Sequence, residues 1–367
     1  MSKPLSYPVE HTTPPSSFVV PPSTPPPTEK KPFFQAQRVV ARFEAIQAGR
    51  SIQQDPWTEY QLEPGEYDRI EHILSHNKAL LSFTKDKIRY DYDLESHRLV
   101  VRMPTGVHER FIDRVEDAIR SQLKAIRGGS DKAASFAQKV QPARSTEIFF
   151  PAETDSFKGK SKYEPDTSFW HDDAEYPGVI IEVAYSQKRK RLDRLAENYL
   201  LDSDASVQVV VGLDVEYGKK GTKKATLSVW RTRIIHTPDG DELEAYRDVE
   251  NEVFRDEQGK PTDLPGLRLF LSDFACEELT KDEISSKEPD IFVSSKELCQ
   301  YLDAAEHKMS RHDGLVKHTV VPGVKKRKRS ATPPDEINTS DEERYIKEEE
   351  RATKRVADRD ADYEIAC

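Results

Sequence analysis

The chain has few of the residues that build covalent cross-links or metal clusters. Its 367 residues include only three cysteines, Cys276, Cys299 and Cys367, which are widely spaced. They show neither metal-binding spacing nor a disulfide framework, a usage typical of a reducing compartment. The sequence also has no glycine-rich phosphate loop, no zinc cluster and no Ser-His-Asp arrangement. These absences exclude the most easily recognised nucleotide, zinc and serine-hydrolase sites.

Hydrophobic residues are scarce for a chain of this length. They make up 36% of the sequence, whereas charged residues make up 33%, and no apolar run approaches the ~20 residues of a membrane span. The proline-rich N-terminus lacks the apolar core of a signal peptide. We therefore expect an intracellular protein that makes no membrane contact, with a packed middle and disordered ends.

An excess of positive charge is also lacking, because the formal net charge is −10. Contact with nucleic acid must therefore come from local basic clusters. One cluster is Lys188–Arg191, and Lys158, Lys160 and Lys162 extend it in a predicted loop. A solvated helix face explains the first cluster equally well.

A third basic run lies near the C-terminus. It consists of Lys325, Lys326, Arg327, Lys328 and Arg329. Such a run in a polar context is typical of a nuclear-import signal, and a nucleic-acid-binding tail is the alternative. The predicted location is the nucleus, and otherwise the cytoplasm.

Composition along the chain divides it into four parts. Residues 1–32 form a proline-rich tail that we predict to be disordered. A folded domain over 33–275 begins with a helical lead-in at 33–60 and is followed by a helical extension over 276–309. Residues 310–367 form a charged tail, also predicted to be disordered.

Hydrophobic periodicity predicts the elements of the folded domain. A helix over 107–126 follows a hairpin over 88–103, and residues 130–143 read as a polar linker. The strands that follow are predicted at 146–150, 166–170 and 179–185, before a helix at 189–201, a strand at 207–211 and a second hairpin that ends at 225–230. The core order of helix, three strands, helix and strand indicates an α/β sheet with helices on its faces.

A carboxylate stands in the middle of the most apolar of these strands. Glu182 is the central residue of Gly178–Tyr185, and Asp166 is the first residue of the neighbouring predicted strand. An ionised carboxylate is costly to bury unless it is paired or binds a metal. Carboxylates on two neighbouring strands are typical of an oxygen-ligand site for Mg²⁺. A structural ion pair of Glu182 with a helix arginine is the alternative.

Two short motifs and their order resemble a known family. The first is the Pro-Asp pair that ends at Asp166. The second begins at Glu182 and reads Glu-Val-Ala-Tyr-Ser, followed by a charged helix and by Tyr199. They resemble the PD-(D/E)XK nuclease superfamily, most closely its bacterial branch of restriction endonucleases with a Glu-Val-x-Ser motif. The resemblance covers residues 85–232, and the whole chain is also similar to fungal proteins of this kind.

The resemblance implies a fold and a chemistry. The fold is a restriction-endonuclease-like αβββαβ core with added β-hairpins and disordered termini. Asp166 and Glu182 would bind Mg²⁺ or Mn²⁺, with the Val183 carbonyl as a third ligand. The metal would activate water and neutralise charge during hydrolysis of nucleic-acid phosphodiesters. Nucleic acid is thus the predicted partner.

The chain departs from the superfamily motif at Ala184, where the motif has lysine. A cation is needed near the phosphate, and the candidates are Lys188, which we favour, Lys190 and Gln187. Two functions follow. The first is a Mg²⁺-dependent nuclease-like enzyme, and the alternative is a catalytically inactive nuclease-fold domain that serves as a protein-interaction or DNA-binding module. A lysine that reaches the carboxylates would favour the enzyme.

Two residues at the start of the long helix are further candidates. Glu109 is a possible additional acidic ligand, but we interpret it as an exposed ion-pair partner. His108 is interpreted as an ordinary helix-start residue.

Overall fold

The computed structural model describes residues 33–50, 57–154, 157–185, 189–216, 221–284, 288–310, 316, 318–321, 323–325 and 347. The chain divides into two units, Met1–His312 and Asp313–Cys367, and every helix and strand discussed below lies in the first unit. The predicted disordered tails, 1–32 and nearly all of 310–367, lie outside the described residues.

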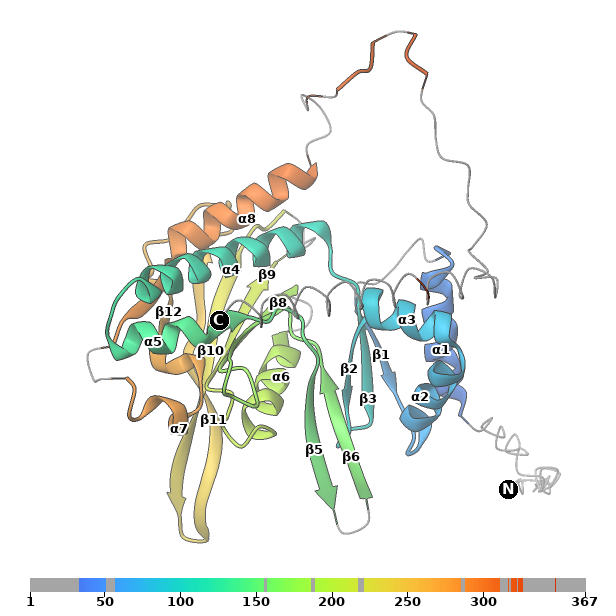
Figure 1. The fold of residues 1–367 in the computed structure, drawn as a ribbon, viewed down its shortest axis with the longest axis horizontal. Coiled ribbons are helices and arrows are strands. Elements are labelled where there is room, and N and C mark those ends of the chain that lie inside the picture. Colours follow the sequence, from blue (N-terminus) through green and yellow to red (C-terminus); the bar gives the residue numbers. More distant parts are fainter. Residues whose placement is uncertain are drawn as a thin grey trace, which may run out of the picture. The chain divides into compact units, whose positions relative to one another are not determined.

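Two large β-sheets organise the first unit (Figure 1). The N-terminal sheet has five strands in the order β1-β3-β2-β6-β5, and all its pairs are antiparallel. Its strands are β1 (Trp57–Gln61), β2 (Arg89–Asp93), β3 (Arg98–Arg102), β5 (Ile148–Thr154) and β6 (Phe157–Tyr163). One face is covered by the helices α1 (Phe34–Gln47), α2 (Glu66–His76) and α3 (Lys78–Lys87).

The alternation of side chains along β2 and β3 gives this sheet two different faces. Tyr90 and Tyr92 of β2 pack with Val101 of β3 into the hydrophobic cluster beneath the helices. Asp91 of β2 and Arg102 of β3 point to the opposite face and are also buried. A face that carries charged residues is therefore enclosed in the molecule.

The second sheet has six strands in the order β11-β10-β9-β8-β7-β4. Only β8 and β9 are parallel, while the other neighbours are antiparallel. The strands are β4 (Val140–Pro142), β7 (Thr167–His171), β8 (Val179–Tyr185), β9 (Val209–Val215), β10 (Ala225–Thr237) and β11 (Gly240–Arg255). The ends of β10 and β11 extend beyond the sheet as a long ribbon (Figure 1).

Helices cover both faces of the six-stranded sheet. Ile181 and Val183 of β8 lie in the cluster with α4 (Gly106–Arg127), α5 (Lys132–Lys139) and α8 (Ser295–Ser310). Ile180 lies in the cluster on the other face with α6 (Arg189–Leu201). Because side chains alternate along a strand, Glu182 faces α6. A small sheet of β12 (Gly266–Phe270) and β13 (Asp290–Ser294), with η2 (Leu271–Phe274) and α7 (Glu277–Thr280), completes the unit.

The long helix α4 forms as its sequence predicts. The Thr105 side chain accepts a hydrogen bond from the backbone N–H of His108 and so caps the first turn. Its apolar stripe is buried, including Phe111 and Val115. This cap sets where α4 begins, and it thereby positions His108 beside Asp166.

Two predictions for the chain between α4 and β7 were wrong, one of a linker and one of a core strand. The expected linker at 130–143 contains α5 and β4, because Asp131 caps α5 and Phe136 and Val140 bury their side chains. The expected first core strand at 146–150 belongs to β5, which pairs with β6 in the N-terminal sheet. The first strand of the helix-strand core is therefore β4, which pairs with β7.

The mixed α/β class is confirmed by this arrangement of three sheets and covering helices. Among the residues with described structure, no helix is both long enough and apolar enough to cross a lipid bilayer.

Candidate functional site

Asp166 and Glu182 lie side by side in the structure. Asp166 directly precedes β7, whose first residue, Thr167, pairs with Ile181 of β8. The Oδ2 atom of Asp166 accepts a hydrogen bond of 2.8 Å from the backbone N–H of Val183. Asp166 is only 7% exposed and Glu182 only 2%. The contact that Val183 makes to this site is thus through its N–H.

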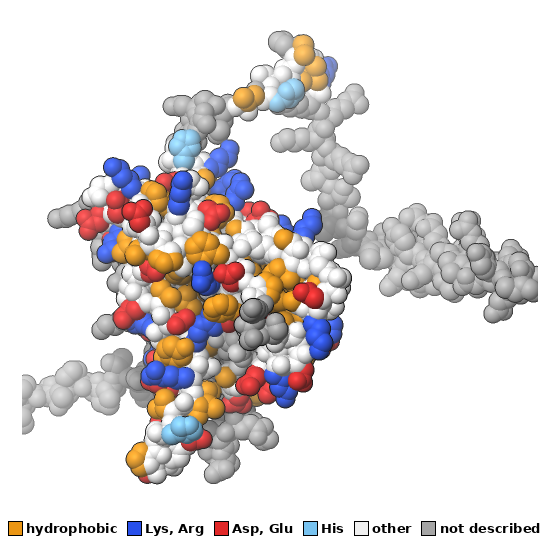
Figure 2. All heavy atoms as spheres, turned by 90° about the vertical axis from the view of Figure 1, so that its left-hand side faces the viewer, with side chains coloured by type: hydrophobic (Ala, Val, Ile, Leu, Met, Phe, Trp, Pro, Cys, Tyr) orange, Lys and Arg blue, Asp and Glu red, His pale blue; other side chains and the backbone are white. Residues whose placement is uncertain are grey.

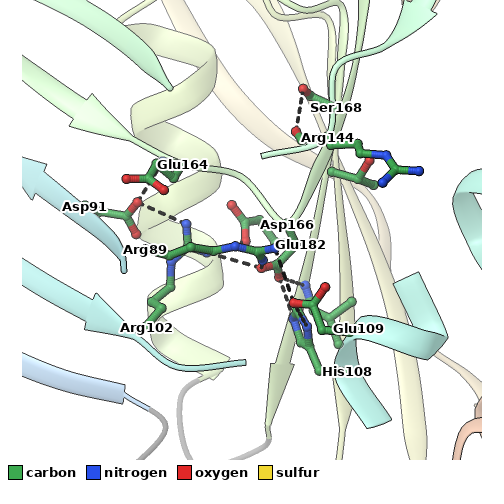
Figure 3. Close-up of polar contacts among 12 residues, drawn as sticks. Arg89, Asp91, Arg102, His108, Glu109, Arg144, Glu164, Asp166, Ser168 and Glu182 are labelled. Atoms are coloured by element: carbon green, nitrogen blue, oxygen red, sulfur yellow. Dashed lines mark hydrogen bonds and ion pairs between the residues drawn. The ribbon is translucent and has the colours of Figure 1, made fainter. Parts of the chain in front are cut away.

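Arg102 of β3 occupies the space between the carboxylates (Figure 3). Its Nη1 atom lies 2.9 Å from Oε2 of Glu182 and 3.6 Å from Oδ1 of Asp166. Its Nη2 atom lies 3.0 Å from Oδ1 of Asp91, on the neighbouring strand β2. Three buried carboxylates from two sheets therefore surround one guanidinium group.

The remaining carboxylate oxygens of the two acids face other donors. The Tyr199 hydroxyl of α6 donates to Oε1 of Glu182 at 2.8 Å. The Nε2 atom of His108 lies 2.9 Å from Oδ2 of Asp166. Arg89 approaches the same residue, with Nη1 at 3.4 Å from Oδ1. Every oxygen of Asp166 and Glu182 therefore has a hydrogen-bond or ion-pair partner.

The site reaches solvent at the start of α4. The Nη2 atom of Arg89 lies 3.2 Å from Oε1 of Glu109, and the Glu109 side chain is 45% exposed. Arg89 is partly buried, whereas His108 is buried beneath them. The interpretation of Glu109 as an ion-pair partner fits this position, but its partner is Arg89. His108 lies in the first turn of α4, as expected, and its ring in addition contacts Asp166.

The electrostatic environment shifts the pKa values of Asp166 and Glu182 in opposite directions. Burial alone would raise the pKa of Asp166, but His108 and Arg102 outweigh it and hold the pKa well below its usual range. For Glu182 burial dominates, so its pKa is raised although Arg102 lies close. Burial would lower the pKa of His108, but the charge and hydrogen bond of Asp166 raise it to about 9. His108 is therefore a cation at neutral pH.

This donor set does not fit the predicted metal ion. Mg²⁺ needs carboxylate oxygens that are free to bind it, whereas those of Asp166 and Glu182 already face Arg102, His108 and Tyr199. The positive charge that a metal would supply is already present as a guanidinium group. In the described part of the chain, no group of three or more His, Cys, Asp or Glu residues is arranged to hold a metal.

The predicted lysines are only partly described. Lys188 lies outside the described residues, and Lys190 lies in α6 without a described side chain. Of the basic run near the C-terminus, Lys325 is described and exposed, whereas Lys326–Arg329 lie outside the described residues. The structure therefore leaves the lysine contribution at Lys188 and Lys190 a prediction.

The three lysines expected in a loop before Asp166 lie in strand β6 instead. The side chain of Lys158 is not described, and Lys160 is exposed with its Nζ atom over the Phe149 ring. Lys162 is buried, with Nζ at 2.9 Å from Glu147 and 2.6 Å from Glu164. The charge of Lys162 is thus paired with two carboxylates, so Lys162 cannot extend a phosphate-binding patch.

Sequence reasoning missed Arg102 and Asp91 altogether. The only signal was the alternation of polar with apolar residues in the hairpin at 88–103, which shows that its polar residues share a face. Nothing in that pattern tells which sheet the polar face meets.

Comparison with known proteins gives no family for the chain. No protein-family model matches it, and no curated protein matches it either.

Proposed function

We propose that the chain is a nuclease-like domain that has lost metal-dependent hydrolysis and acts as a binding module. Support for the nuclease-like fold comes from the order α4, β4, β7, β8, α6 and β9. In this core β4, β7 and β8 are successively antiparallel, whereas β8 and β9 are parallel. That is the αβββαβ order that the resemblance implies, with α5 added after α4 and the β5–β6 hairpin inserted after β4.

The observation that supports loss of hydrolysis is the position of Arg102. A hydrolytic metal would have to displace its guanidinium group from Asp91 and Glu182, at 3.0 Å and 2.9 Å. A buried cation paired with several carboxylates is held strongly, because its removal leaves uncompensated charge. Arg102 thus provides a permanent positive charge where catalysis would need an exchangeable metal.

Access to the carboxylates supports the same conclusion. Asp91 and Arg102 reach them from β2 and β3, so the N-terminal sheet covers this part of the core (Figure 3). A phosphodiester needs an open path to both acids, but Glu182 is almost fully buried. The ion network therefore serves to fasten the N-terminal sheet to the six-stranded sheet.

The face of the molecule drawn in Figure 2 favours a protein partner over nucleic acid. On the face drawn in Figure 2, Lys and Arg side chains are interspersed with Asp, Glu and hydrophobic groups. Phosphate backbones are bound by concentrated positive charge. The net charge of −10 also opposes association with a polyanion.

We expect the purified full-length protein to leave single- and double-stranded DNA and RNA intact in the presence of Mg²⁺ or Mn²⁺. The reason is that Arg102 excludes the metal from the carboxylates. Cleavage is measured on labelled oligonucleotides, and metal binding by the shift in thermal unfolding. The Glu182→Gln variant is the matched control, and its fold should remain intact, because burial raises the pKa of Glu182 and glutamine has the shape and the neutral charge of the protonated acid. Metal-dependent cleavage by the wild type that disappears in Glu182→Gln would overturn the proposal.

A further inference from the structure

Helix α2 carries two exposed histidines one turn apart. His72 and His76 are four positions apart in the sequence, and their ring centroids lie 4.2 Å apart. Residues at this spacing lie on the same face of a helix. The spacing equals that of the two zinc-binding histidines in the His-Glu-x-x-His motif. The two imidazole rings therefore lie against each other on the exposed side of α2.

A hydrogen bond to the backbone orients the ring of His76. The Nδ1 atom of His76 lies 2.8 Å from the backbone carbonyl oxygen of His72, which can only accept a hydrogen bond. The proton of the neutral ring is therefore on Nδ1, and the lone pair of Nε2 is free. Metal-binding histidines are commonly oriented by such a bond from their second nitrogen to a backbone carbonyl. The hydroxyl of Ser75 lies close to the same Nδ1 atom, at 3.2 Å.

We propose that His72 and His76 form a binding site for a divalent transition-metal ion of the zinc, nickel and copper class. Neutral imidazole nitrogens suit these ions, whereas Mg²⁺ prefers oxygen ligands. The site does not depend on the buried carboxylates. Helix α2 covers the apolar face of the N-terminal sheet, and Asp91 and Arg102 lie on its other face.

The metal at this site keeps open coordination positions. No third His, Cys, Asp or Glu completes a cluster within the residues that the structure describes. Zinc normally has four ligands, so water molecules or atoms of another molecule complete the shell. Both histidines are exposed, which leaves these positions accessible.

The test is titration of the full-length protein with Zn²⁺ and, separately, Ni²⁺ by isothermal calorimetry at pH 7.5. Loss of both rings in the double variant His72→Ala, His76→Ala should weaken the affinity by at least about 10- to 100-fold, the usual cost of disturbing such a site. His236→Ala is the matched control, because His236 is exposed on β10 and pairs with Asp241. It should bind like the wild type.

A second readout identifies the ligands directly. Bound Cu²⁺ should show nitrogen hyperfine coupling in its electron paramagnetic resonance spectrum, and the double variant should lose it. Unchanged affinity and spectrum in the double variant, or an equal loss in His236→Ala, would overturn the proposal. Neither result depends on whether the protein hydrolyses nucleic acid.

Discussion

Replacement of Arg102 by methionine is expected to destabilise the protein by about 3–5 kcal/mol, the cost of removing one partner from a buried ion network. The guanidinium group faces Asp91, Asp166 and Glu182, and the Arg102 side chain is almost completely buried. Methionine fills much of the same volume without charge. The three acids then repel one another in a site that excludes water.

The free energy of unfolding in urea measures this cost. Arg89→Met is the matched control. Arg89 pairs opposite Arg102 in the hairpin and also contacts Asp166, but its side chain is 21% exposed and its other partner, Glu109, is at the surface. Ion pairs near solvent contribute about 1 kcal/mol or less. An equal loss in both variants would mean that Arg102 is not the central cation of the network.

The Arg102→Met variant also tests whether arginine stands in place of a metal. Removal of the guanidinium group leaves the carboxylates of Asp91, Asp166 and Glu182 around one position, and Mn²⁺ prefers such oxygen ligands. We expect Mn²⁺ to raise the melting temperature of this variant and to leave that of the wild type unchanged. A similar rise in the wild type would show that the metal and Arg102 do not compete.

Local sequence patterns were sufficient to predict the central elements. The stripe of α4, the apolar run of β8, and α6 and β9 each have a periodicity that depends on a few neighbouring residues. The short elements α5 and β4 were missed, since three strand residues and one helix of eight residues leave almost no period to detect. The pairing of β5 with β6, away from β4, is a choice of sheet that side-chain alternation does not determine.

The sequence predicted the two acids of the candidate site, Asp166 and Glu182, but not Arg102. Glu182 was predictable because a carboxylate interrupts an apolar strand, and Asp166 because it begins the neighbouring predicted strand. Arg102 is 80 residues from Glu182 in the sequence. Its role depends on how the N-terminal sheet packs against the core, and no local pattern contains that information. An ion pair of Glu182 with an arginine was expected as the alternative, but from a helix and not from β3.

The stability of the protein should fall as the pH rises from about 6.5 to about 9, because of His108. Its ring is protonated in the folded protein up to about pH 9, whereas the unfolded chain releases the proton near 6.5. The folded state then holds more protons, so an increase in pH favours unfolding. The contribution is fully present below pH 6.5, is lost by about pH 9, and amounts to about 3 kcal/mol at most. Glu182, whose pKa is also raised by burial, changes stability in the same direction.

The His108→Gln variant separates the contribution of His108 to this pH dependence from that of Glu182. Glutamine can still donate a hydrogen bond to Asp166, but it carries no titrating proton. We expect the free energy of unfolding of the variant to fall less steeply between pH 6.5 and 9 than that of the wild type. Below pH 4 both proteins should lose stability as the pH decreases, since the pKa of Asp166 is depressed in the folded state and its protonation removes the charge that Arg102 and His108 face. If the two proteins have the same slope above pH 6.5, His108 is neutral in the folded state and the ion pair with Asp166 does not form.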